Sequence, residues 1–238
     1  MNKLKPAIVF TLLAGLASGC AQQDTEPDTL VALGDSITYG ANLEDSGSSA
    51  YPYLIGEDTG FTVENLAVSG WQTAQVVSAL REDEDYRQTV QQADVIAMTI
   101  GGNDLLEILR LAQAASGGDP EQMEQILQQQ LDDNTVLDRL REVIEEIQSL
   151  TDAQIVLYNM YNPFPTESPI HDIGEELLPE VNAAFAEIAT SYDNVTLADA
   201  YSAYRNQQDD YIIAGDIHPT ERGQAVLAEI GLEAIDAE

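Results

Sequence analysis

Short apolar runs separated by longer amphipathic stretches dominate the pattern of the chain after its first 28 residues. Five of these runs are rich in Val, Ile and Leu and too short for ordinary helices, and they cover residues 30–33, 61–67, 94–100, 154–158 and 194–197. Because their hydrophobicity is continuous rather than alternating, they are typical of strands buried on both faces. The pattern therefore predicts a five-stranded, mainly parallel sheet.

Longer segments with helical spacing of apolar residues lie between these runs. We expect helices at 74–80, 105–115, 173–192 and 220–235, with the longest amphipathic region at 120–150. The polar residues 132–135 predict a break in that region, with Asn134 or Thr135 as the cap of the second helix. The apolar stripe of 120–150 is typical of core packing, and a lid over a site is the alternative. Alternation of strands and helices predicts a three-layer α/β/α sandwich.

The first 28 residues have the composition of a targeting segment followed by a tether. Lys3 and Lys5 precede the apolar stretch 7–16, which is shorter than the ~20 residues that a membrane-spanning helix needs. The stretch 16–20, Leu-Ala-Ser-Gly-Cys, resembles a bacterial lipobox. The resemblance implies a lipoprotein signal peptide at 1–19, lipidation of Cys20 as a membrane anchor outside the cytoplasm, a tether up to residue 28 and a folded domain at 29–238. A plain secretory peptide is the alternative.

The chain is strongly acidic. Its 238 residues contain 42 Asp and Glu against 9 Lys and Arg, which gives a net charge of −33, and 44% of them are hydrophobic. A hydrophobic fraction of this size supports a sizeable core. The negative charge repels nucleic acid and anionic membrane surfaces, so we do not expect either as a partner. Such a surface suits a high-salt or high-pH habitat, and an ordinary acidic secreted protein is the alternative.

Four polar motifs follow one another along the chain, the first three at or after predicted strands. They are 34–36 (Gly-Asp-Ser), 65–70 (Asn-Leu-Ala-Val-Ser-Gly), 101–104 (Gly-Gly-Asn-Asp) and 216–218 (Asp-Ile-His). Because sites in open parallel sheets form beyond the carboxyl ends of the strands, we expect these motifs to converge. A serine at a strand-to-helix turn exposes its hydroxyl and its backbone N–H to one space, which suits attack on a carbonyl. Turn or helix-cap chemistry is the alternative for each motif alone.

In this order and spacing the four motifs resemble the blocks of the SGNH hydrolases, also called the GDSL lipase/esterase family, over nearly all of the chain after residue 29. The resemblance implies a flavodoxin-like sandwich, an ester substrate and no metal or organic cofactor. It implies Ser36 as the nucleophile and His218 as the general base, with the N–H groups of Ser36 and Gly70 and the side-chain amide of Asn103 as oxyanion donors. We interpret Asp35 as a residue that holds the turn.

The acid of the triad is where the chain departs from this family's pattern, Asp-x-x-His. Gly215 stands three residues before His218, and Asp216 stands two before it. Two arrangements remain open: a shifted loop that still brings Asp216 to His218 Nδ1, or a Ser–His dyad oriented by another group such as a backbone carbonyl. The other histidine, His171, is interpreted as a solvated loop residue, with a substrate contact as the alternative.

Further candidates for substrate contacts are Trp71, which follows Gly70, and Tyr161, Asn162 and Phe164, which follow the fourth predicted strand. A rigid loop and simple packing are the alternatives for them. We predict a monomeric serine esterase or lipase acting on a lysophospholipid, a short-chain acyl ester or an acetylated glycan. A non-catalytic cell-surface binding lipoprotein is the alternative. The α/β-hydrolase fold is disfavoured because its Gly-x-Ser-x-Gly motif is absent.

Overall fold

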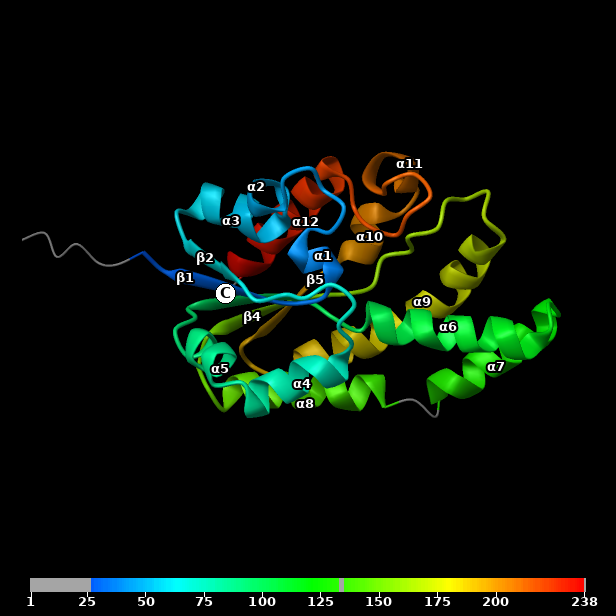
Figure 1. Ribbon diagram of the computed structural model, residues 1–238, viewed down its shortest axis with the longest axis horizontal. Coiled ribbons are helices and arrows are strands. Elements are labelled where there is room, and N and C mark those ends of the chain that lie inside the picture. Colours follow the sequence, from blue (N-terminus) through cyan, green and yellow to red (C-terminus); the bar gives the residue numbers. More distant parts are fainter. Residues whose placement is uncertain (1–26, 133–134, 238) are drawn as a thin grey trace, which may run out of the picture.

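A five-stranded parallel sheet forms the centre of the computed structural model, which describes residues 27–132 and 135–237 (Figure 1). Its strands are β1 (Thr29–Gly34), β2 (Thr62–Asn65), β3 (Val95–Thr99), β4 (Gln154–Tyr158) and β5 (Val195–Ala198). They lie in the order β2-β1-β3-β4-β5, and all neighbours are parallel. The predicted sheet is confirmed, because each predicted run overlaps one strand. The predicted signal peptide and the lipidated Cys20 lie outside the described residues.

Helices cover both faces of the sheet. The helices of the described residues are α1 (Ser36–Tyr39), α2 (Ser46–Ser49), α3 (Tyr51–Thr59), α4 (Thr73–Glu82), α5 (Glu84–Val90), α6 (Gly102–Ser116), α7 (Pro120–Asp132), α8 (Val136–Gln148), α9 (Pro169–Thr190), α10 (Ala200–Tyr204), α11 (Gln208–Tyr211) and α12 (Glu221–Ile235). In Figure 1, α3, α10 and α12 lie above the sheet, and α4, α5 and α8 lie below it. This arrangement is the predicted three-layer sandwich.

The side chains of β1 show why the strands are apolar along their whole length. Val31 and Leu33 pack into the core under α4, α5, α8 and α9, whereas Leu30 and Ala32 pack into the core under α3, α10 and α12. All four are fully buried. Because successive side chains of a strand point to opposite faces, a strand between two helical layers needs apolar residues at every position.

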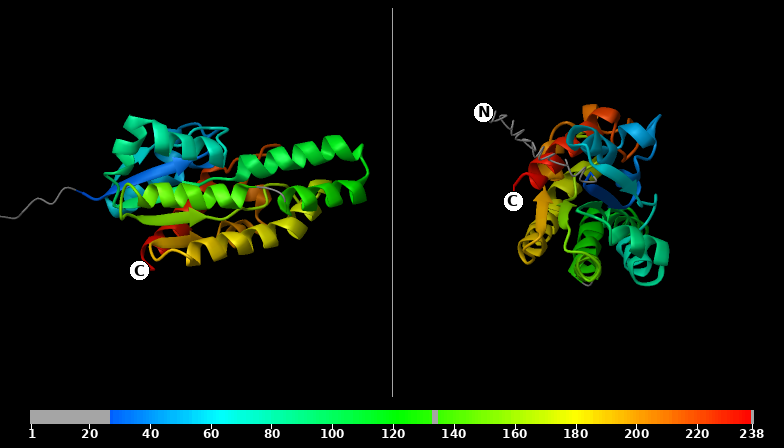
Figure 2. Two further views of the ribbon diagram at one scale, coloured as in Figure 1. Left: turned by 90° about the horizontal axis from the view of Figure 1, so that it is seen from below. Right: turned by 90° about the vertical axis from the view of Figure 1, so that its left-hand side faces the viewer.

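The helices α6 and α7 form a hairpin that extends past the carboxyl ends of the strands (Figure 2). They share a third apolar cluster, in which Ile108 and Ala112 of α6 pack with Leu127 of α7 and Val136 of α8. The amphipathic region 120–150 forms two helices, as predicted, because α7 ends at Asp132 and α8 begins at Val136. The stripe of α8 is buried in the main core, as its composition predicted, and the stripe of α7 packs on α6 instead.

None of the helices in the described ranges is long and apolar enough to cross a membrane.

The end of β1 approaches the end of β3 so closely that residue 34 must be glycine. Gly34 has a φ of +122°, and a Cβ added there would lie 1.9 Å from the carbonyl oxygen of Thr99. The N–H of the next residue, Asp35, donates to that same oxygen at 3.1 Å. This contact fixes the direction in which the chain leaves β1.

We therefore expect Gly34→Ala to destabilise the fold by more than about 4 kcal/mol, because it adds a backbone overlap to the cost of a left-handed conformation. Gly60→Ala is the matched control, since Gly60 has a φ of +80° and open space around an added Cβ. It should cost only about 1–2 kcal/mol. Urea unfolding of both variants measures the difference, and equal losses would contradict the overlap argument.

Candidate active site

Ser36 stands at the turn between β1 and α1 and is almost completely buried. The preceding Asp35 caps α1, because its carboxylate accepts a hydrogen bond from the N–H of Ile37 at 3.0 Å. Ser36 is the first residue of the helix, and the N–H groups of the first turn have no partner within the helix. Its hydroxyl and its N–H therefore both remain available at the end of β1.

His218 comes from the loop before α12, and its imidazole lies between two side chains. Its Nε2 lies 2.9 Å from Ser36 Oγ, and its Nδ1 lies 2.6 Å from Asp216 Oδ1. With the Nδ1 proton donated to the carboxylate, Nε2 is left to accept the proton of the serine hydroxyl. The three residues that the sequence suggested as a triad are thus brought together.

A tight turn carries Asp216 to the imidazole from two residues away. The N–H of Asp216 donates to the carbonyl of Ile213 at 2.9 Å, and Gly215 adopts a φ of +76° inside this turn. The N–H of Ile213 in turn donates to the carbonyl of His218 at 2.9 Å, which closes the loop. Of the two arrangements that the sequence left open, the geometry matches the shifted loop, with Asp216 against the ring.

Three hydrogen bonds hold the carboxylate of Asp216. Partial burial raises its pKa, but donors from the N–H of Ile217, from His218 and from the side chain of Asn42 outweigh burial, so the pKa lies below its ordinary value. The Nδ2 of Asn42 donates to Asp216 Oδ2 at 2.6 Å. Asn42 was not predicted from the sequence, because no motif marks a single asparagine in a loop.

Gln224 docks the helix that follows His218 onto the helix that begins with Ser36. It is fully buried, and its Nε2 donates to the carbonyl of Ile37 in α1 at 3.1 Å. Its Oε1 accepts from the N–H of Tyr51 in α3 at 2.9 Å. The loop that carries the histidine is therefore tied to the segment that carries the serine.

The two remaining predicted donors are Gly70, in the loop before α4, and Asn103, in the first turn of α6. Gly70 has a φ of +84°, and a Cβ added there would meet nothing within 4 Å. Asn103 is the second residue of α6, and the N-cap is Gly101, which excludes the helix-cap alternative for Asn103. Its Nδ2 donates to the carbonyl of Trp71 at 2.8 Å.

A buried carboxylate joins the first turn of α6 to the first turn of α4. Asp104 accepts from the N–H of Thr73 at 3.0 Å and from its hydroxyl at 2.8 Å. The N-termini of α4 and α6 are thereby held side by side. The loop that contains Gly70 is therefore anchored just before α4 begins.

An apolar pocket of about 160 Å³ opens from Ser36 into the space between α6, α7 and α9. Leucine and isoleucine are the commonest residues in its wall, and the three helices contribute Leu105, Leu106, Ile108 and Leu109 from α6, Leu127 and Leu131 from α7, and Ile170, Ile173, Leu177 and Leu178 from α9. All of these residues except Ile170 were predicted as helical, and none of them was predicted as part of a pocket. The available signal was the presence of two amphipathic helices in succession, α6 and α7, with no strand between them.

Three of the four candidate substrate contacts line this pocket, namely Tyr161, Asn162 and Phe164. Trp71 is not among its lining residues. The ring of Trp71 packs against Tyr86, with centroids 6.0 Å apart, so the packing alternative describes this residue.

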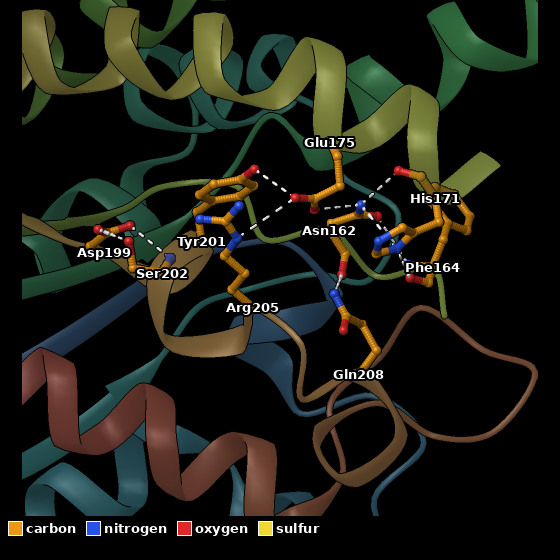
Figure 3. Close-up of polar contacts among 9 residues, drawn as sticks. All are labelled: Asn162, Phe164, His171, Glu175, Asp199, Tyr201, Ser202, Arg205 and Gln208. Carbon is orange, nitrogen blue, oxygen red and sulfur yellow. Dashed lines mark hydrogen bonds and ion pairs between the residues drawn. The ribbon is translucent and has the colours of Figure 1, made fainter. Parts of the chain in front are cut away.

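The amide of Asn162 is hydrogen-bonded to neighbouring groups of the protein (Figure 3). Its Nδ2 donates to the carbonyl of His171 at 3.1 Å and to Glu175 at 3.0 Å. The interpretation of His171 as a solvated loop residue is wrong, because it is buried in the first turns of α9. Its Nδ1 donates to the carbonyl of Phe164 at 2.8 Å. These contacts fasten the loop after β4 to α9 and so fix one wall of the pocket.

Comparison with known proteins identifies a family and several relatives. Residues 32–226 match the model of the GDSL-like lipase/acylhydrolase family. The spore germination lipase LipC of Bacillus licheniformis is 28% identical over 203 residues, which cover 83% of this chain and 92% of that protein.

Two solved structures show the same fold at low sequence identity. The lipase Lip_vut3 from a goat rumen metagenome has a TM-score of 0.71 at 24% identity, covering 87% of this chain and 97% of its own. A catalytic mutant of Axe2, an acetylxylan esterase of Geobacillus stearothermophilus, has a TM-score of 0.61 at 18% identity, covering 89% of this chain and 95% of its own.

Asp35 supplies a prediction that can be tested through stability alone. Burial raises its pKa to about 7, against the opposing effect of hydrogen bonds from Ile37 and Thr99. The folded state therefore keeps a proton that the unfolded chain loses near its ordinary pKa of 3.8, so this group lowers the free energy of unfolding as the pH rises from about 4 to about 7. Asparagine cannot ionise, and we expect Asp35→Asn to gain stability relative to wild type between pH 5 and pH 8.

Chemical unfolding of Asp35→Asn and of wild type at both pH values measures how the difference in their stability changes with pH. The exposed Asp58→Asn removes one negative charge elsewhere and serves as the control, for which we expect no comparable gain. A stability gap between Asp35→Asn and wild type that does not change with pH would contradict the raised pKa.

Proposed function

The chain belongs to the GDSL-like lipase/acylhydrolase family, and we propose that it hydrolyses carboxylic esters through an acyl-enzyme on Ser36. The observation that carries this proposal is the continuous contact from Asp216 Oδ1 to His218 Nδ1 at 2.6 Å and from His218 Nε2 to Ser36 Oγ at 2.9 Å, at the mouth of an apolar pocket.

Each group in the contact has a step in the proposed reaction. His218 Nε2 takes the hydroxyl proton while Ser36 Oγ attacks the ester carbonyl. The imidazolium, stabilised by Asp216, then gives that proton to the departing alkoxide, and the acyl group stays on Ser36. A water molecule, deprotonated by the same nitrogen, attacks the acyl-enzyme; as the bond from the acyl carbon to Ser36 Oγ breaks, His218 returns the proton to Ser36 Oγ and the acid is released. Asp216 orients the ring and keeps its charge throughout.

The negative oxygen formed at each attack needs donors already in place. We assign this role to the N–H groups of Ser36 and Gly70 and to the side-chain amide of Asn103. An asparagine amide has two hydrogens, and the bond from Asn103 to the carbonyl of Trp71 uses one and orients the other. Loss of one such donor typically lowers the rate by ~10²–10³.

The lining of the pocket favours an acyl chain of medium or greater length over an acetyl group. Leu109 stands six residues after Asn103 on α6, which places it roughly 9 Å further along the helix axis. An acetyl group would leave this wall unfilled, whereas each methylene buried against it contributes about 0.8 kcal/mol. We therefore favour a fatty acyl ester, such as a lysophospholipid, over an acetylated glycan.

The alternative of a non-catalytic binding lipoprotein drew its support from the missing Asp-x-x-His pattern. That support weakens, because Asp216 contacts the imidazole from the shifted position. Lipidation of Cys20 and a location on the outer side of the cell membrane stay part of the proposal, on the strength of the lipobox resemblance alone.

Covalent labelling tests the catalytic assignment. We expect a fluorophosphonate to modify Ser36, as mass spectrometry of the labelled peptide would show. Labelling should disappear in Ser36→Ala and fall by at least about 10³-fold in rate in His218→Ala, which lacks the base. His171→Gln, which alters the other histidine, should keep more than half of the labelling rate. A folded wild-type protein that is not labelled would support the binding alternative.

Ester chain length tests the pocket. We expect kcat/KM for p-nitrophenyl decanoate to exceed that for the acetate by at least about tenfold, because the longer chain fills the apolar wall. Leu109→Trp should lower activity on the decanoate and leave the acetate unchanged. Leu111→Trp is the matched control on the same helix, since Leu111 is exposed and is not among the lining residues. A preference for acetate would contradict the fatty acyl assignment.

A further inference from the structure

Asn42 reaches the candidate triad from the loop between α1 and α2. Its Nδ2 lies 2.6 Å from Asp216 Oδ2 and 3.1 Å from His218 Nδ1. No family block or sequence motif singled it out. Its backbone is unusual as well, because its φ of 66° lies in the left-handed region. Asparagine is one of the few residues with a side chain that adopt this left-handed conformation regularly.

The contact matters because Asp216 is held unequally at its two oxygens. Oδ1 accepts from His218 Nδ1 and from the N–H of Ile217, both at 2.6 Å. Oδ2 accepts from Asn42, and the Asp216 side chain is 26% exposed to solvent. Without the Asn42 amide, the hydrogen bonds to Oδ1 from Ile217 and His218 would be left to hold the carboxylate, and Oδ2 would lose the side-chain donor that fixes its side of the plane.

The shift of the acid by one position explains why an external anchor is needed. An acid two residues before the histidine approaches the ring through a shorter and tighter loop than one three residues before it. We propose that Asn42 is a positioning residue that fixes the carboxylate plane of Asp216 against His218 and so replaces the orientation that the usual spacing would supply. This inference rests on the proposed function of the same site.

Substitutions that preserve the backbone separate this role from a structural one. Glycine and aspartate both tolerate the left-handed conformation, so Asn42→Gly removes the donor and Asn42→Asp replaces it with a second carboxylate facing Asp216. We expect kcat to fall about tenfold in Asn42→Gly with KM unchanged, in line with a hydrogen bond to a charged group. It should fall further in Asn42→Asp, because like charges repel.

Asn206→Gly is the matched control, because Asn206 also has a positive φ, 59°, and lies in the loop between α10 and α11. It should keep the wild-type kcat. Equal losses in Asn42→Gly and Asn42→Asp, or a kcat of Asn42→Gly within twofold of wild type, would overturn the positioning role.

An NMR measurement tests the same contact without any measurement of activity. The chain contains two histidines, so the Nδ1 proton of His218 can be followed with His171 as an internal reference. We expect a downfield Nδ1 resonance in wild type that moves upfield or broadens in Asn42→Gly, while His171 is unchanged. An unchanged His218 resonance overturns the inference.

This readout keeps the two proposals distinguishable. If wild type hydrolyses no ester, the proposed function fails, and a shifted His218 resonance in Asn42→Gly still supports the role of Asn42 in holding Asp216. If wild type is active and neither kcat nor the resonance responds to Asn42→Gly, only the positioning role fails.

Discussion

The 2.9 Å contact between His218 Nε2 and Ser36 Oγ is the constraint on which the rest of the site depends, and it joins residues 182 positions apart. No local interaction can hold such a pair, so each partner must be fixed by the fold. Ser36 follows β1, whose exit is set by the close approach of Gly34 to Thr99. His218 precedes α12, which Gln224 ties to Ile37 in α1. Strand order reverses between β1 and β3, where an open parallel sheet leaves a crevice at its carboxyl edge.

Two aspartates near the serine show how the environment gives carboxyl groups different pKa values. Asp35 is deeply buried, and burial outweighs its hydrogen bonds and raises its pKa to about 7. Asp216 is only partly buried, and its hydrogen bonds from Ile217, His218 and Asn42 outweigh burial and lower its pKa. A carboxylate that stabilises an imidazolium must stay charged, which Asp216 does. Asp35 instead serves the turn, where its oxygen accepts from the N–H of Ile37 whether or not it carries a proton.

The sequence was sufficient to predict what depends on periodicity and order. Continuous apolar runs identified all five strands of the described residues, and the order of the motifs identified Asp216 and His218, which meet at Ser36. Prediction failed where the outcome depends on contacts between distant segments. His171 has no feature that distinguishes a buried residue of α9 from an exposed one, because its burial comes from the loop after β4. The role of Asn42 was not predicted for the same reason, because its partner Asp216 is 174 residues away. The helix α3 was not predicted, although Pro52 suits the first turn of a helix.

The placement of the α6–α7 hairpin separates the reacting groups from the pocket that faces them. The hairpin lies between β3 and β4 in the chain, at the carboxyl edge of the sheet, and has its own apolar cluster around Ile108 and Leu127. The hairpin contributes no residue to the strands or to the contact between His218 and Ser36. Asn103 and Asp104, at the first turn of α6, belong to both parts, because Asp104 also holds the start of α4. A fold built in this way can keep one set of reacting groups while the wall opposite them changes, and it is the leucines and isoleucines of this wall that support the proposal of an apolar acyl group.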